Sequence, residues 1–156
     1  MSNISSRALG EIIAVASVVF SLLFVGLQFR QSTIASKAAA YQELGIATAE
    51  LLQSLAANGE LHNIIEQAAS SEIDGISSMS ASDLSRAKDW TEGTLRLYET
   101  IYLQVQQGLL EPEALEYLGW AGFREGNLLK NMWPHVKDGV PPEFAAYLEA
   151  IWAGSP

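Results

Sequence analysis

The longest apolar stretch of the chain runs from Ile12 to Leu27 and contains no charged residue. Extended to residues 8–29 it has 22 residues, and as a helix it would be about 33 Å long, close to the hydrocarbon thickness of a bilayer. It is apolar on every face, which distinguishes it from an amphipathic helix lying on a membrane surface. We therefore predict a short tail over residues 1–7 and a transmembrane helix over residues 8–29.

Two other interpretations compete for this stretch. A cleaved signal peptide should begin with a positive segment, but here Arg7 is followed directly by the acidic Glu11. The alanine-rich run Ala38–Ala40 resembles a cleavage site but lies about ten residues beyond the apolar run. The core helix of a water-soluble protein is the second alternative, and an apolar run of this length argues against it.

The chain after the apolar stretch also has a helical pattern. From Gln31 to Ala57 it contains no proline and is rich in residues that favour helices. Amphipathic spacing of three or four residues links Tyr41, Leu44, Thr48, Leu51 and Leu55. We expect the transmembrane helix to continue without a break as far as Asn58–Gly59, which predicts a C-cap or a kink.

Helical spacing recurs in four further segments: 60–69, 81–108, 113–136 and 142–153. The segment 81–108 is apolar on two faces, which predicts a central position in a bundle. No stretch alternates strictly over more than a few residues, so no sheet is expected. The predicted fold class is all-α: an N-terminal transmembrane helix that continues into a small helical bundle of about four further helices.

Local signals predict where these helices begin and end. Ser80 is placed to cap the helix that follows it, with Asp83 at the third position. Gly108 is placed to end that helix. Three glycines, at 119, 122 and 126, predict a break or a bend within 113–136, and the pair Trp133–Pro134 predicts the end of that segment. The serine-rich segment 70–82 is expected to be a loop.

Charge is concentrated in the part of the chain that follows the apolar stretch. The formal net charge is −9, and Arg7 and Glu11 cancel, so 8 of the 9 basic and 17 of the 18 acidic residues lie from Arg30 onward. We therefore predict an acidic helical domain over residues 30–156. An acidic domain repels phosphate backbones, so nucleic acid is not an expected partner. With no basic cluster to hold anionic head groups, the expected link to a lipid bilayer is the hydrophobic helix itself.

The orientation in the membrane is predicted from few charges. Arg30 and Lys37 follow the apolar stretch, whereas Arg7 and the amino terminus precede it. The positive-inside bias therefore favours a cytoplasmic C-terminal domain. The chain has no cysteine, which excludes disulfides and thiolate chemistry but fits either side of a bacterial membrane.

Small residues form a row along one face of the predicted transmembrane helix, at Gly10, Ala14, Ser17 and Ser21. Their spacings of four, three and four residues stack them. Small residues let two helices approach closely in lipid, so the row predicts self-association or packing against a membrane-protein partner. The alternative is that these residues simply face lipid.

Aromatic and polar positions in the second half carry a resemblance. They are Trp90, Leu97–Glu99 with Tyr102 and Gln104, Gln107–Leu110, Gly122–Arg124 with Trp133, and Pro142–Phe144 with Tyr147. Their order resembles a group of uncharacterised small bacterial membrane proteins with one N-terminal transmembrane helix and a helical domain. The resemblance implies the same architecture in a bacterial inner membrane. No activity is established for that group, so it implies no catalytic residue.

The candidates for chemistry are few. His62 and Glu66 are four residues apart, but a metal would need a further ligand, and His135 has none at helical spacing. Glu99 lies between Tyr98 and Tyr102, with Arg96 and Arg124 as expected partners, and its carboxylate is either a functional group with a raised pKa or a structural one. The four tryptophans, with Phe123 and Phe144, line either a ligand pocket or the core. We expect no catalytic residue, cofactor or metal.

These observations favour a non-enzymatic, membrane-anchored helical interaction module. It would be an accessory or scaffold subunit of a membrane protein assembly, or a homo-oligomer. One alternative is a pore-forming homo-oligomer, with Ser17, Ser21 and Gln28 lining a narrow path. Another is a membrane-tethered enzyme that uses Glu99 and the aromatic residues.

Overall fold

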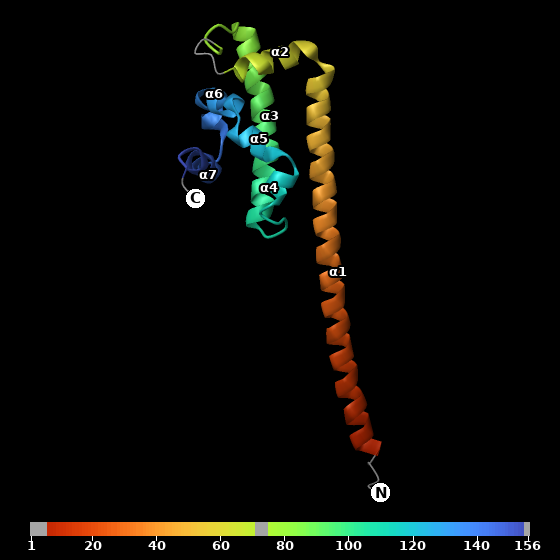
Figure 1. Ribbon diagram of the computed structural model, residues 1–156. Helices are drawn as coiled ribbons and strands as arrows, with labels where there is room; N and C mark the ends of the chain where they lie inside the picture. Colours follow the sequence, from red (N-terminus) through yellow and green to blue (C-terminus); the bar gives the residue numbers. More distant parts are fainter. Residues whose placement is uncertain (1–5, 71–74, 155–156) are drawn as a thin grey trace. The chain divides into compact units, whose positions relative to one another are not determined.

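The computed structural model describes residues 6–70 and 75–154, and every regular element within them is helical (Figure 1). This confirms the predicted all-α class. The first helix, α1 (Ser6–Ala57), includes both the apolar stretch and the helical segment predicted to continue it. The chain divides after Ala39 into two units, which are described separately.

The first unit consists of the beginning of α1. Three of its hydroxyl side chains hydrogen-bond to the preceding turn of their own helix. Ser17 Oγ donates to the Ile13 carbonyl at 2.8 Å, Ser21 Oγ to the Ser17 carbonyl at 2.9 Å, and Thr33 Oγ1 to the Phe29 carbonyl at 3.0 Å. These bonds satisfy the hydroxyl donors within one helix, as an apolar surrounding would require.

The second unit contains the end of α1, from Ala40, and all the helices that follow. These helices are α2 (Gly59–Ala68), α3 (Ala81–Gln106), α4 (Ala114–Tyr117), α5 (Trp120–Glu125), α6 (Asn127–Val136), the 3-10 helix η1 (Lys137–Gly139) and α7 (Pro142–Trp152). The segment 113–136, predicted to contain a break, is divided into three helices rather than two.

Two glycines account for this division. Gly119, between α4 and α5, has φ +79°, in the left-handed region that other residues rarely adopt. Gly126, between α5 and α6, is extended, and a Cβ built on it would lie 2.8 Å from the Gly122 carbonyl oxygen. A left-handed residue and an extended residue each stop the α-helical hydrogen-bond pattern, so two breaks result.

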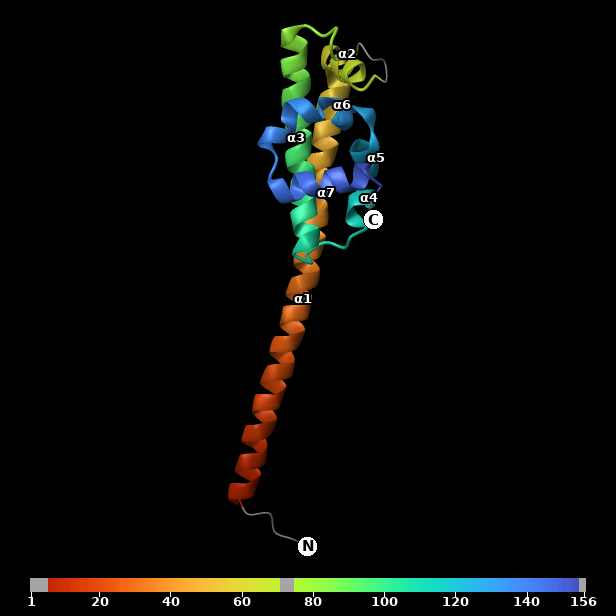
Figure 2. The same cartoon turned by 90° about the vertical axis from the view of Figure 1, so that its left-hand side faces the viewer.

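Helix α3 is the central element of this unit, as its two apolar faces predicted. It contacts α2, α4 and α6, and α7 runs across it (Figure 2). One face contributes Leu95, Tyr98 and Ile101 to a buried cluster with α6 and α7. Ala87 belongs to a second cluster, with Ile64 and Ile65 of α2 and Leu128 and Met132 of α6.

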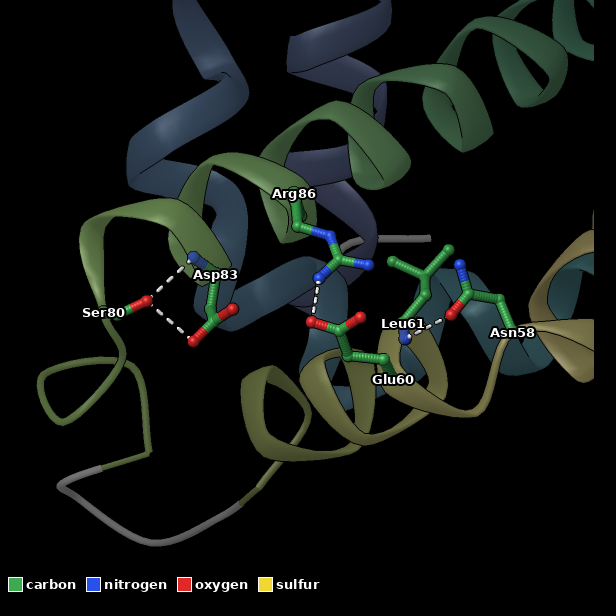
Figure 3. Close-up of polar contacts among 6 residues, drawn as sticks. All are labelled: Asn58, Glu60, Leu61, Ser80, Asp83 and Arg86. Atoms are coloured by element: carbon green, nitrogen blue, oxygen red, sulfur yellow. Dashed lines mark hydrogen bonds and ion pairs between the residues drawn. The ribbon is translucent and has the colours of Figure 1, made fainter.

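Side-chain caps fix the starts of α2 and α3 (Figure 3). Asn58 accepts the Leu61 N–H at 3.0 Å, so the helix boundary falls at Asn58–Gly59 as predicted, but Asn58 is the N-cap of α2 and not the expected C-cap. Ser80 Oγ accepts the Asp83 N–H at 3.1 Å, which confirms the predicted cap of α3. Arg86 Nη1 lies 2.6 Å from Glu60 Oε1 and joins the two helices at the surface.

Helix ends differ from the predictions in one respect. The expected end at Trp133–Pro134 was wrong, because α6 continues through Pro134 to Val136. Only two residues of α6 follow Pro134, so the missing N–H costs a hydrogen bond of the last turn alone. Gly108, with φ +69°, follows the end of α3 as predicted. Of the predicted loop over 70–82, residues 71–74 lie outside the described residues.

Replacing Gly126 by alanine should destabilise the second unit, because the new Cβ would meet the Gly122 carbonyl oxygen at 2.8 Å, which belongs to rigid backbone. We expect a loss of about 1–3 kcal/mol in the free energy of unfolding. Urea unfolding of the full chain in a nonionic detergent, followed by tryptophan fluorescence, measures it. Gly122→Ala is the matched control, since its Cβ meets nothing within 4 Å. Equal stabilities of the two variants would contradict the steric explanation.

Candidate functional site

The first candidate site is the apolar surface of α1. Every large apolar side chain from Ile12 to Phe29 is exposed, from 43% at Val25 to 72% at Phe20. Among the described residues, one helix is long and apolar enough to cross a membrane, with a mean hydropathy of 2.4 and none of its most apolar window buried. An apolar face of this extent has to be covered by lipid or by another protein surface.

The row of small residues lies on the same surface. Gly10, Ala14, Ser17 and Ser21 are all exposed, and a Cβ built on Gly10 would meet nothing within 4 Å. The hydroxyls of Ser17 and Ser21 donate to their own helix, which leaves little polarity for the path of the pore alternative. The row therefore offers close approach to a second helix, and its use in packing stays a prediction.

The predicted polar group around Glu99 is only partly assembled. Tyr98 is fully buried, and its ring stacks on Trp120 with centroids 5.7 Å apart and meets Phe144 edge-on at 5.3 Å. Tyr102 is half-buried and packs on Tyr147 with centroids 4.6 Å apart. The Tyr98 and Tyr147 hydroxyls lie 3.4 Å apart. Tyr147 was not predicted to belong to this polar group, and its hydroxyl places it there.

Glu99 lies apart from this group and is paired with Arg96, which was one of its two expected partners. Arg96 Nη1 donates to Glu99 Oε2 at 3.0 Å, and Arg96 Nη2 donates to the Gly139 carbonyl at 2.7 Å. Neighbouring residues of a helix point about 100° apart, so Glu99 cannot share the direction of Tyr98. The cavity beside Glu99 has about 60 Å³, which suits a few waters rather than a substrate.

Arg124 joins the tyrosines rather than Glu99. Its Nη2 donates to Glu125 Oε1 at 2.9 Å, and its charge acts on both Tyr98 and Tyr147. Burial raises the pKa of the Tyr98 hydroxyl, the Tyr147 hydroxyl acts in the same direction, and Arg124 opposes both. Burial lowers the pKa of Arg124, but Glu125 and the tyrosines raise it by more. Tyr98 therefore stays neutral and Arg124 stays cationic near pH 7, so both groups have a structural role.

Two of the four tryptophans anchor the C-terminal helix. The Trp133 Nε1–H donates to Glu149 Oε1 at 3.0 Å, and the Trp152 Nε1–H donates to the Arg124 carbonyl at 2.8 Å. Lys137 Nζ lies 2.6 Å from the same Glu149 oxygen. Hydrogen bonds from Lys137 and then Trp133 lower the pKa of Glu149. Since the folded pKa lies below the ordinary value, this contact stabilises the fold above that value and is lost as the pH falls.

The other two tryptophans, Trp90 and Trp120, line a cavity together with Phe123. The core interpretation holds for Trp120 and Trp133, which are buried, and Trp152 is half-buried against the same cluster. Trp90 is half-buried at the cavity, and the ligand-pocket interpretation stays a prediction. Thr48 and Leu51 also line this cavity, and they were not predicted to do so. Their amphipathic spacing indicated a buried face, but it did not indicate which helix packs against that face.

The histidines give no metal site in the part of the chain that the structure describes. His62 Nε2 lies 3.8 Å from Glu66 Oε1, and both side chains are more than half exposed. No group of three or more metal-ligating side chains occurs among the residues described.

Comparisons of the chain with protein-family models, with curated proteins and with solved structures found no match. The resemblance of the second half to a group of small bacterial membrane proteins therefore stays a prediction.

Proposed function

We propose that this chain is a membrane-anchored helical interaction module. In this proposal the apolar part of α1 lies in a lipid bilayer and the acidic second unit lies in water. The chain acts by binding, as an accessory or scaffold subunit of a membrane protein assembly or as a homo-oligomer. The proposed location is the bacterial inner membrane, with the second unit in the cytoplasm.

The observation that carries the proposal is the exposure of the large apolar side chains from Ile12 to Phe29. Removing such a side chain from water is worth about 1.5–3 kcal/mol. A dozen of them together gain on the order of 20 kcal/mol, more than the 5–15 kcal/mol or so that stabilises a typical domain. Burial of this surface in lipid or against protein is therefore favoured over its exposure to water by a wide margin. The absence of burial in the most apolar window weighs against a core helix.

Two further features support the anchor and its use in binding. The hydroxyls of Ser17, Ser21 and Thr33 donate to their own backbone, so the helix exposes no unsatisfied side-chain donor at those positions. The small-residue row from Gly10 to Ser21 is open, so a second helix can approach the backbone closely there. The charged and tyrosine groups near Glu99 are paired with one another, which fits a binding role better than a catalytic one.

The anchor is tested by two arginines in the middle of the apolar run. Val19→Arg with Leu23→Arg should oppose insertion by about 5–7 kcal/mol and shift the chain from a carbonate-washed membrane fraction to the aqueous or aggregated fraction. The matched control, Ile46→Arg with Leu103→Arg, places the same charges on exposed apolar positions of the second unit and should leave the chain in the membrane. A wild-type chain that stays in the aqueous fraction, or whose mature form begins beyond position 30 by mass spectrometry, would overturn the proposal.

The orientation is tested with single cysteines, which the cysteine-free sequence makes simple. Ser77→Cys, at an exposed position of the second unit, should react with a membrane-impermeant maleimide only after the cells are permeabilised. Ser2→Cys should react in intact cells, because two cations follow the apolar run and one precedes it. The reverse labelling pattern would place the second unit outside the cytoplasm.

Self-association through the small-residue row is tested by adding bulk to it. Ala14→Ile with Ser17→Ile should separate helices that approach there, and convert an oligomer to a monomer in mild detergent, as measured by size-exclusion chromatography with light scattering. The control, Val15→Ile with Val19→Ile, adds bulk on a different face and should leave the mass unchanged. A wild-type chain that is monomeric and brings no partner from native membranes would count against the interaction role.

A further inference from the structure

The four tryptophans differ in whether their indole N–H groups have an acceptor. Trp133 and Trp152 donate to Glu149 and to the Arg124 carbonyl. The Nε1 atoms of Trp90 and Trp120 are buried and have no hydrogen-bond partner among the residues that the structure describes. An indole nitrogen can only donate, and native proteins satisfy the large majority of buried polar atoms. The two unsatisfied donors therefore call for an acceptor that the chain does not provide.

The residues that carry these donors surround one cavity. It has about 120 Å³, is partly open, and is lined by Trp90 of α3, Trp120 of α5 and Thr48 of α1. Thr48 Oγ1 is also buried without a partner. Among the described residues five buried side-chain polar atoms lack a partner, and three of them belong to residues that line this cavity. All the lining residues lie in the second unit.

The rest of the wall defines what can fill the cavity. Leu51, Leu118 and Phe123 make it mainly apolar, and no charged side chain from the described part of the chain lines it. A carboxylate would lose its hydration without meeting a cation, which is costly, and the chain already carries a net charge of −9. A neutral acceptor such as a carbonyl oxygen avoids this cost. Water alone fits less well, because 120 Å³ holds several waters and each needs two to four polar partners.

The size limits the apolar part of the ligand. A cavity of about 150 Å³ lined by apolar side chains is known to accept benzene. A cavity of about 120 Å³ that is partly open accordingly suits a ring or a branched chain of roughly five or six carbons.

We propose that this cavity is a binding site for a small, neutral, apolar molecule that carries a carbonyl oxygen. The apolar body lies against Leu51, Leu118 and Phe123, and the oxygen accepts hydrogen bonds from the indole N–H groups of Trp90 and Trp120, with the Thr48 hydroxyl beside them. The carbonyl belongs either to a free small molecule or to the ester of a lipid. The proposal does not depend on the membrane anchor, because the site lies within the second unit.

Nitrogen-15 labelling of the tryptophans in the full chain, in dodecyl maltoside micelles, tests the site. The probe is cyclohexanone, and methylenecyclohexane is the control of the same shape that lacks an acceptor. We expect saturable downfield shifts of the Trp90 and Trp120 indole protons with the ketone at roughly millimolar concentration, and smaller shifts with the hydrocarbon. The Trp133 and Trp152 signals, whose donors are already bonded, should stay in place and report that the chain is folded. Trp90→Phe and Trp120→Phe assign the signals.

A variant that lacks the Thr48 hydroxyl tests whether the ligand is held by polar contacts or only by its shape. Thr48→Val keeps the shape and removes the hydroxyl, and should weaken ketone binding about two- to tenfold. Thr100→Val is the matched control, because the Thr100 hydroxyl is exposed and bonds to the Arg96 carbonyl of its own helix; it should leave binding unchanged.

Three results would overturn the proposal: no saturable shift, equal shifts with ketone and hydrocarbon, or rapid exchange of the Trp90 and Trp120 indole protons with water without any response to the ketone. The last of these would show a cavity filled by water. The source of the carbonyl is found by comparing these two signals in nanodiscs of diester and diether phosphatidylcholine without ketone. A shift confined to the diester lipid identifies the lipid ester, and no difference identifies a free molecule.

Discussion

The second unit depends on the burial of Tyr98 on α3. Its ring touches Trp120 of α5 and both Phe144 and Tyr147 of α7, so one side chain joins three helices. A phenol can take this position only because its hydroxyl has neighbours, Tyr147 and Arg124, that keep it from being stranded among apolar atoms. The short helices after α3 have little stability of their own. Packing against the Tyr98 ring stabilises two of them, α5 and α7.

Much of the architecture was predictable because it follows from periodicity and from local signals. The apolar run, the helical spacing of 81–108 on two faces and the Ser80–Asp83 cap depend on residues close in sequence, and the structure has all three features. The division of 113–136 was only partly predictable, since three glycines indicate a break but do not tell which of them adopts a non-helical conformation. Gly119 and Gly126 do so, whereas Gly122 lies within α5.

The candidate sites were less predictable, because they depend on partners distant in sequence. Glu99 was placed with Tyr98 on sequence adjacency, but adjacency on a helix means different directions, and Glu99 meets Arg96 and not Tyr98. The cavity joins Thr48 to Trp90 and Trp120, which follow Thr48 by 42 and 72 residues. Whether a tryptophan N–H finds an acceptor is decided by such distant neighbours, so composition could not distinguish Trp90 from Trp133.

The position of α7 at the far end of the described chain has a consequence for biosynthesis. Phe144 and Leu148 of α7 complete the buried cluster around Tyr98, and they are translated roughly 115 residues after the apolar run ends at Phe29. At about 5–20 residues per second this is an interval of roughly 6–23 s. The apolar run is therefore synthesised well before the core of the second unit can close, so in the proposed membrane anchor the insertion of α1 and the folding of the second unit would be separate events in time.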